Sequence, residues 1–346
     1  QDALDVAVSG DQIWIAEGTY IPTDLDGSTD PREASFRLIA GVEIYGGFQG
    51  NEADIDSRIP TLYRVLLSGD LNGDDDGVGD NSENAYHVVT ADALVGASPI
   101  LDSVYIGGGN ADSGGGNNWY GGGLIVENYP VASTAYPIVR QTRFVFNEAY
   151  FGAAVGVADA NSSVQLTRCL LANNYTTNHG GAIFNIGTCR IDNCLLVANE
   201  AKYNGGAVYS VGSHFSIIGS TIVQNSADFV GGVFLNFGDN QGSNNIIWGN
   251  TDVNGNNDQI YLAGGTWTGN YNCIENFVND SAGPNTIIEN PRFVSEFGND
   301  GLPATGDENF RLIQQSPCID AGDNTVVIVG VDIEGNDRLY DDPYTV

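Results

Sequence analysis

An asparagine returns along this chain at intervals of 25 to 27 residues. The members of this series are Asn147, Asn174, Asn199, Asn225 and Asn250. Each stands three residues after an apolar residue, and a glycine pair follows each of the middle three by six residues. A fixed period of this size indicates stacked structural repeats. Because so short a repeat has no room for a helix in addition to strands, the chain must fold into stacked coils of short strands.

Aligning the chain on the asparagines places other residues in common columns. Three positions earlier stand the apolar residues Phe144, Leu171, Leu196, Ile222 and Ile247. Five positions earlier stand the small polar residues Thr142, Cys169, Cys194, Ser220 and Asn245. Two positions after the glycine pairs stand Ile183, Val208 and Phe234. Short strands between Gly/Asn turns predict an all-β chain. We expect a single-stranded right-handed parallel β-helix, a solenoid with coils about 4.8 Å apart.

The asparagines and glycines have predicted roles at the corners of the coils. Asparagine tolerates the left-handed backbone conformation, so each asparagine of the series is predicted to adopt it at a sharp corner. Stacked asparagine amides also hydrogen-bond from one coil to the next. The glycine pairs are predicted to occupy corners where φ is positive or where backbones approach closely.

The repeat favours one elongated domain over residues 1–346. Residues 1–10 are predicted to be an N-terminal cap with a short helix at 2–8. Residues 11–285 are predicted to be coils, and 286–346 the last coils with an irregular C-terminal cap. The chain has no methionine and no segment typical of a signal peptide or membrane span. We therefore expect a processed product whose leader and anchor lie outside this sequence.

The charge of the chain restricts its partners. It has 44 acidic and 12 basic residues and a net charge of −32. Binding phosphate requires clustered lysine and arginine, so nucleic acid and anionic membranes are excluded as partners. The same charge disfavours polyanionic glycans and favours divalent cations.

Two sets of motifs resemble known families. Residues 180–183 (Gly-Gly-Ala-Ile) and 144–147 (Phe-Val-Phe-Asn) resemble the repeats of chlamydial-type polymorphic outer-membrane proteins. A fuller pattern over residues 10–20, 36–48, 67–72 and 316–322 resembles bacterial secreted right-handed parallel β-helix proteins of the choice-of-anchor kind. The resemblance covers most of the chain and implies an exported surface protein, often adhesive. The closing motif usual in that family is absent, which leaves the anchoring mode open.

Two loops carry oxygen side chains at alternate positions, which is how a flexible loop wraps Ca²⁺. The first loop offers Asp70, Asn72, Asp74 and Asp76. The second offers Asp252, Asn254, Asn256 and Asp258. The first departs from the EF-hand pattern, with Asp75 at the glycine position and Asn81 at the glutamate position. Calcium is the one cofactor that the sequence predicts, and a solvated acidic turn is the alternative for each loop.

Glu148 and Glu200 are the carboxylate pair considered for catalysis. Both follow a series asparagine, two coils apart, which predicts a separation of about 9–10 Å with Tyr175 between them. That separation is near the upper limit for an inverting glycosidase, but residues just past a corner are usually solvated. Four arginines near the coils fall in different columns and are not expected to form a basic cluster: Arg140, Arg143, Arg168 and Arg190.

Aromatic residues in Gly/Asn-rich segments are candidates for stacking on sugar rings, with core or loop packing as the alternative. The candidates are Trp119, Tyr120, Trp267 and Tyr271. The cysteines give a further expectation. Cys169 and Cys194 share a column within disulfide reach, yet stacked free thiols in a dry core are equally ordinary. Cys189 is predicted to be core, and Cys273 and Cys318 either pair with each other or stay free.

These patterns predict a cell-surface or extracellular β-helix that is structural or adhesive and is stabilised by calcium. Its expected partners are a glycan, a surface protein or further copies of itself. The alternative is a polysaccharide-active hydrolase or lyase that works along a groove of the solenoid. The asparagine repeat is clear in the sequence, whereas no convergent set of catalytic groups is visible. A non-catalytic role is therefore favoured.

Overall fold

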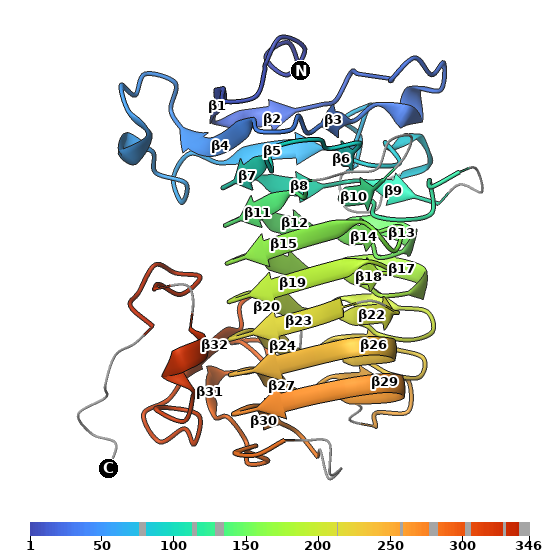
Figure 1. Cartoon of the computed structure of the whole chain (residues 1–346). Helices are drawn as coiled ribbons and strands as arrows, with labels where there is room; N and C mark the ends of the chain where they lie inside the picture. The colour runs from blue at the N-terminus through green and yellow to red at the C-terminus, as the bar shows by residue number, and fades with distance from the viewer. Residues whose placement is uncertain are drawn as a thin grey trace.

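The computed structural model describes residues 1–75, 81–112, 116–128, 135–212, 214–256, 259–276, 283–301, 306–327 and 330–338. Over these ranges the chain is a parallel β-solenoid with no α-helix. Its coils stack from the N-terminal end to the orange strands in Figure 1. Short 3₁₀ turns interrupt the loops: η1 (Pro31–Glu33), η2 (Ile55–Ser57), η3 (Asn81–Glu83) and η5 (Asn324–Val326).

One sheet of 15 strands contains two rows that merge in the long strands β26 (Val233–Ser243) and β29 (Ile260–Asn270). The first row contains β1 (Gln12–Ala16), β4 (Glu43–Phe48), β7 (Ile100–Asp102), β11 (Ile138–Arg140), β15 (Ser163–Thr167), β19 (Thr188–Asp192) and β23 (His214–Ile218). The second row contains β3 (Phe36–Arg37), β6 (Val89–Asp92), β10 (Leu124–Glu127), β14 (Val155–Val157), β18 (Ile183–Asn185) and β22 (Val208–Val211).

The remaining faces of each coil are two further parallel sheets. The nine-stranded sheet contains β2 (Gly18–Tyr20), β5 (Val65–Ser68), β8 (Tyr105–Gly107), β12 (Arg143–Val145), β16 (Leu170–Ala172), β20 (Leu195–Val197), β24 (Thr221–Val223), β27 (Ile246–Trp248) and β30 (Cys273–Ile274). The six-stranded sheet contains β9 (Asn110–Ala111), β13 (Glu148–Phe151), β17 (Tyr175–His179), β21 (Glu200–Ala201), β25 (Ser226–Ala227) and β28 (Thr251–Asp252). The period in the sequence is therefore one turn of the solenoid.

The asparagine series forms a continuous buried ladder. Each amide nitrogen donates to the amide oxygen one coil further on, over 3.0 Å from Asn147 to Asn174 and 2.8 Å from Asn225 to Asn250. The series asparagines are at most 1% exposed. The left-handed residue, however, is the one before each asparagine, for example Ala198 with φ 58°. The predicted conformation of the asparagines themselves was wrong, because the left-handed turn comes first and aims the next side chain into the corner.

The column of small polar residues forms a second ladder between the first row and the nine-stranded sheet. The Cys169 amide donates to Cys194 Sγ over 3.3 Å, and the Cys194 amide donates to Ser220 Oγ over 3.0 Å. Asn245 then donates from Nδ2 to Asn272 Oδ1 over 3.0 Å. Left-handed residues again precede the ladder, at Gln141, Arg168, Asn193, Gly219, Asn244 and Tyr271. The column is small and polar because its side chains receive the backbone N–H of the neighbouring coil.

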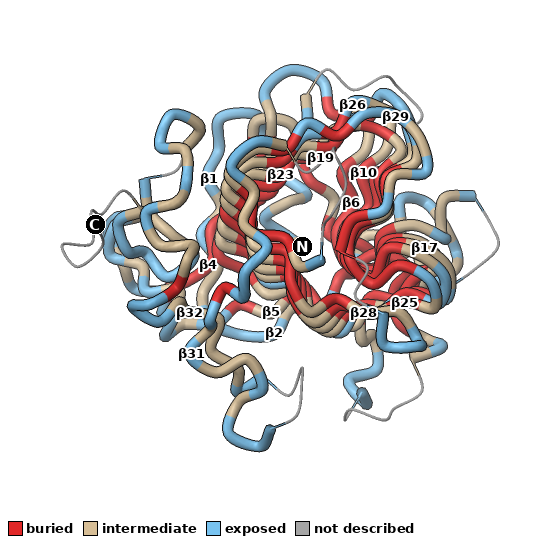
Figure 2. The backbone as a smooth tube through the Cα atoms, turned by 90° about the horizontal axis from the view of Figure 1, so that it is seen from below, coloured by how far each residue is buried: buried red, intermediate tan, exposed pale blue. Residues whose placement is uncertain are grey.

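The core is a narrow apolar column inside the coils, shown in red in Figure 2. The residues three positions before the asparagines are all fully buried in it. Leu4 and Ala7 pack against its first coils, but residues 2–6 form turns, so the predicted capping helix was wrong. The antiparallel hairpin of β31 (Phe293–Ser295) and β32 (Asn309–Leu312) folds back beside the nine-stranded sheet (Figure 1). There Phe293 and Phe310 pack on an outer apolar cluster that includes Trp248.

Candidate functional site

Aromatic side chains gather along one edge of the solenoid, on both sides of the glycine corner. We call this surface the aromatic face. Its members come from loop 116–121, from β13 and β17, from residue 203, and from the second row with its continuation in β26 and β29. They are Trp119, Tyr120, Tyr150, Phe151, His179, Phe184, Tyr203, Tyr209, Phe234 and Tyr261. In-register pairing of parallel strands places one ring above the next along the axis.

The rings of the aromatic face form an unbroken series of contacts. Phe151 and Phe184 have centroids 4.6 Å apart, and Tyr209 lies 4.8 Å from Phe234 at an interplanar angle of 7°. Stacked rings cover each other's faces, so the middle of the series turns ring edges outward. The ends differ from the middle. Tyr261 is 50% exposed, Tyr203 44% and Trp119 38%, so these three rings offer the most surface to a ligand.

A polar cleft of about 690 Å³ lies at the N-terminal end of the same outward column of residues. Along this column Arg37, Thr90 and Ile125 precede Gly156 and Phe184 in register. Loop 116–121 therefore contributes both to the cleft, through its asparagines, and to the aromatic face. The titratable groups that line the cleft are Asp26, Glu33, Arg37, His87, Asp92 and Glu127.

Two carboxylates of the polar cleft have different environments. Asp92 and Glu127 are in-register neighbours on β6 and β10. Arg37 forms an ion pair with Oδ2 of Asp92 and a second one of 2.9 Å with Asp26. Burial raises the pKa of Glu127, and the negative charges of Asp92 and Asp159 raise it further. A raised pKa suits a carboxyl group such as Glu127 to the role of general acid beside a second carboxylate.

The carboxylates chosen from the sequence lie elsewhere. Glu148, Tyr175 and Glu200 stack in register on the outer face of the six-stranded sheet, as the alignment predicts. Burial raises the pKa of Tyr175, and the charge of Glu200 adds to this. Glu200 itself is exposed. No described cavity is lined by this pair, so catalysis by Glu148 and Glu200 has no enclosing site.

The first predicted calcium loop brings carboxylates together. One oxygen each from Asp70, Asp74 and Glu83 lies within 4.8 Å of the others. The charges of Asp74 and Asp75 contribute to a raised pKa of Glu83, although its own backbone N–H favours the ionised form. Oδ1 of Asp70 accepts the amide of Gly73 over 2.6 Å. This all-oxygen donor set fits a hard cation such as Ca²⁺.

The membership of the first loop differs from the prediction. Glu83 joins the cluster although it was not among the ligands predicted from the sequence. Asp76 lies outside the described residues. In the second loop Asp258 also lies outside them. There Asp252 accepts the backbone amides of Asn254 and Asn256, both over 2.8 Å, so its carboxylate closes its own turn.

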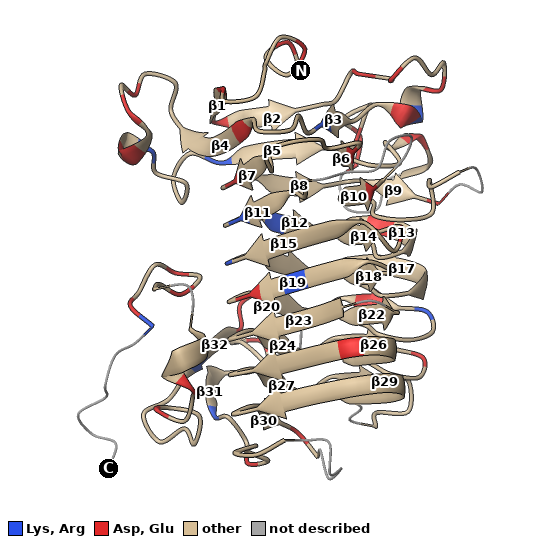
Figure 3. Cartoon of the chain, viewed as in Figure 1, with Lys and Arg blue, Asp and Glu red and all other residues tan. Residues whose placement is uncertain are grey.

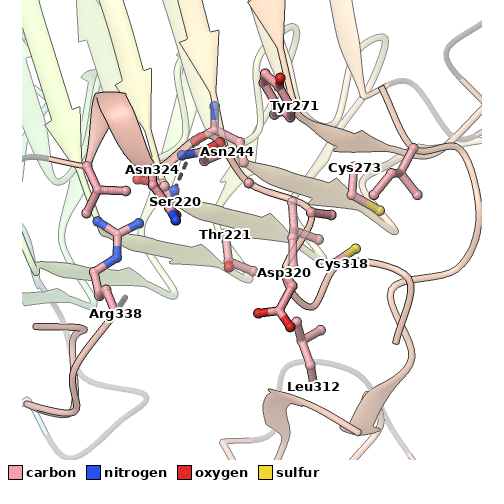
Figure 4. Close-up of a pocket in the computed structure, with 17 residues that line it drawn as sticks. Ser220, Thr221, Asn244, Tyr271, Cys273, Leu312, Cys318, Asp320, Asn324 and Arg338 are labelled. Atoms are coloured by element: carbon pink, nitrogen blue, oxygen red, sulfur yellow. Dashed lines mark hydrogen bonds between the residues drawn. The ribbon is translucent and has the colours of Figure 1, made fainter. Parts of the chain in front are cut away.

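The four predicted sugar-stacking residues have separate fates. Trp119 and Tyr120 belong to the aromatic face. Trp267 is 7% exposed and closes the core from strand β29, so the loop assignment was wrong and its ring faces the interior. Tyr271 is a left-handed corner residue beside a cavity of about 670 Å³ (Figure 4).

The cavity shown in Figure 4 lies between the nine-stranded sheet and the C-terminal segment, and it brings the last two cysteines together. The Cys273 and Cys318 thiols are in hydrogen-bond contact, which raises the pKa of Cys273 and lowers that of Cys318. All five cysteines are reduced. Burial raises the pKa of Cys189 to about 12, in agreement with its predicted place in the core.

The sequence alignment missed the aromatic column because one coil is one residue shorter than its neighbours. Counting from the glycine pairs placed Phe234 with Ile183 and Val208, but Val233 occupies that inward position. Phe234 instead continues Phe184 and Tyr209 on the outside. The third coil is one residue shorter between its asparagine and this strand, and this shortening hid the pattern. Asp92 and Glu127 carry no motif in the sequence and were missed for that reason.

Comparison with protein-family models, with curated proteins and with solved structures found no match to this chain. Among the residues that the structure describes, none of the helical segments has the length and apolar character needed to cross a membrane.

Proposed function

We propose that this protein is an exported β-solenoid scaffold, of the choice-of-anchor kind, that binds neutral glycans along its aromatic face at the cell surface or outside the cell. The aromatic face is the observation that carries the proposal. Aromatic side chains combine a large apolar ring with low conformational freedom, so they suit the apolar faces of sugars. Charged groups are sparse on the long strands in Figure 3, where most of the ribbon is tan. A neutral polymer would therefore meet little of the repulsion that a net charge of −32 implies.

Affinity electrophoresis in gels that contain neutral polysaccharides tests this proposal. We expect retardation of the wild-type protein by at least one polymer from a panel of laminarin, xylan, mannan, cellulose derivatives and starch. Trp119→Ala and Tyr261→Ala should each weaken binding about tenfold, because both rings are exposed to solvent at the two ends of the face. Phe146→Ala is the matched control, since Phe146 is 68% exposed at a different corner. Lack of retardation by every polymer, or equal loss in the control, would contradict the proposal.

A second candidate function is hydrolysis of the bound glycan in the polar cleft. It is favoured by one observation: Glu127, whose pKa is raised by burial, lies beside Asp92, which forms an ion pair with Arg37. In this scheme Glu127 donates a proton to the glycosidic oxygen. Release of reducing ends from a retained polymer, lost in Glu127→Gln, would support it. Retention without turnover leaves the binding function alone.

We also propose that calcium stabilises loop 70–83. The support is the convergence of Asp70, Asp74 and Glu83, whose mutual repulsion a divalent cation would relieve. Calorimetric titration of chelator-treated protein should show binding, and Glu83→Gln should weaken it. Asn161→Ala, a change on an exposed surface, should not.

We also propose self-association through the end strands, which light scattering of the purified protein would detect as a dimer or larger species.

A further inference from the structure

Three arginines converge on the outer face of the nine-stranded sheet, away from the aromatic face. They line a cavity of about 300 Å³ together with Tyr105, Gln141 and Glu334. Residue 64 immediately precedes β5, Arg143 begins β12, and Arg168 is the left-handed corner residue before β16. From the sequence we expected no basic cluster, because Arg140, Arg143, Arg168 and Arg190 occupy different columns. That expectation was wrong, because long side chains from neighbouring columns reach the same hollow.

We call this cavity the arginine cleft. The ring of Tyr105 packs against two of its three arginines. Tyr105 pairs in register with Arg143 on the next coil, so the two side chains are neighbours on one face of the sheet. The guanidinium carbon atoms of Arg64 and Arg143 each lie 5.2 Å from the Tyr105 ring centre. Contact with the ring fixes the planes of the guanidinium groups. Their N–H groups are thereby held in place before any ligand arrives, which lowers the entropy lost on binding.

The three cations lack acidic partners in a very acidic molecule. Within the described residues, none of the ion pairs involves Arg64, Arg143 or Arg168. Arg168 donates from Nη2 to Gln141 Oε1 over 3.3 Å, while its buried Nε has no hydrogen-bond partner. Glu334, the one carboxylate of the cleft, is bound by Arg311 at 2.7 Å. With 44 acidic residues in the chain, three neighbouring arginines that form no ion pair with a carboxylate are a specific feature of this surface.

We propose that the arginine cleft binds a compact oxyanion, a carboxylate or a sulfate group, as the single anionic group of a ligand the size of one sugar residue. Guanidinium groups recognise such anions by paired, charge-assisted hydrogen bonds. The cavity is at the lower end of the range for small-ligand pockets. The net charge of −32 repels a chain that carries many charges, so the ligand bears an isolated one. The attraction is screened by salt and does not depend on pH between about 5 and 9, because arginine stays charged.

Isothermal titration with three probes tests this inference on the whole chain at low ionic strength. The probes are sodium sulfate, D-galacturonate and neutral D-galactose. We expect binding of sulfate, of galacturonate or of both, and none of galactose. Sulfate alone identifies an inorganic-type anion site, whereas tighter binding of galacturonate identifies an acidic sugar. Absence of heat with both anions up to about 50 mM, well above typical metabolite affinities, overturns the inference.

Matched charge variants make the assignment specific. Arg143→Gln should weaken anion binding about tenfold or more, the usual effect of removing a charge-assisted hydrogen bond. Lys202→Gln removes the same charge from an exposed pair with Asp228 on another sheet and should have no such effect. If Arg143→Gln fails to fold, Arg64→Gln replaces it, because Arg64 precedes its strand and is exposed. Equal binding by Lys202→Gln and the arginine variant would refute the site. Glycan retention by the aromatic face is a separate measurement on a different surface, so neither result decides the other.

Discussion

Replacing Asn199 by alanine should be among the most destabilising single changes in this solenoid. Nδ2 of Asn199 donates to the Leu171 carbonyl and to Asn225 Oδ1, both over 2.9 Å. Its Oδ1 accepts from the amide of Asn174 over 3.2 Å and from Nδ2 of Asn174 over 2.9 Å. Asn199 is 0% exposed, so water does not replace these bonds. Four lost bonds at about 1 kcal/mol each, with a buried amide left unpaired, give a loss of about 4 kcal/mol.

That loss is a large share of the 5–15 kcal/mol typical of a folded domain. Urea unfolding followed by circular dichroism measures it, and hydrogen exchange of residues 196–227 shows whether the loss begins in the affected coil. Asn161→Ala, on an exposed loop, is the control and should change stability by less than about 0.5 kcal/mol. Asn199→Asp keeps the shape but loses the donors. Its buried carboxyl should have a raised pKa, so its defect should shrink as the pH falls. A loss of 1 kcal/mol or less in Asn199→Ala would refute the ladder as a main source of stability.

Further predictions concern the candidate sites and the thiols. Glu127→Gln should make the protein more stable at pH 7 by thermal unfolding. The raised pKa of Glu127 favours the folded state below the unfolded pKa and loses that benefit as pH rises through the folded value, so a gain that is equally large at pH 4 would contradict this. Asp70→Asn should abolish any rise of the melting temperature caused by millimolar Ca²⁺, whereas an unchanged rise would place the cation elsewhere. At pH 8, iodoacetamide should modify Cys318 first and Cys189 only after unfolding, as mass spectrometry of the peptides would show. Mild oxidation with glutathione disulfide should join Cys273 to Cys318, and a product that links Cys169 to Cys194 instead would disprove that pairing.

The period of the asparagines was enough to predict a parallel β-solenoid, because a corner and an apolar column recur once per turn. Register between coils followed from the same alignment. It placed Glu148, Tyr175 and Glu200 in one column and Cys189 in the core, as the structure has them. The sequence also placed Asp70 and Asp74 in one loop, where their carboxylates lie close together. It did so because alternate oxygen side chains form a local pattern that depends on few long-range contacts.

The surface sites were decided by tertiary structure alone. Asp92 and Glu127 are 35 residues apart in the sequence and become neighbours only because β6 and β10 pair. Arg64, Arg143 and Arg168 meet because successive coils and a C-terminal segment enclose one hollow. Phe234 belongs to the aromatic face because its coil is one residue shorter, which turns this side chain outward. A repeat therefore determines which residues stack on one another, because each coil contacts the next in the same way. What the outer surface binds is set by the exceptions to the repeat, whose positions only the folded chain reveals.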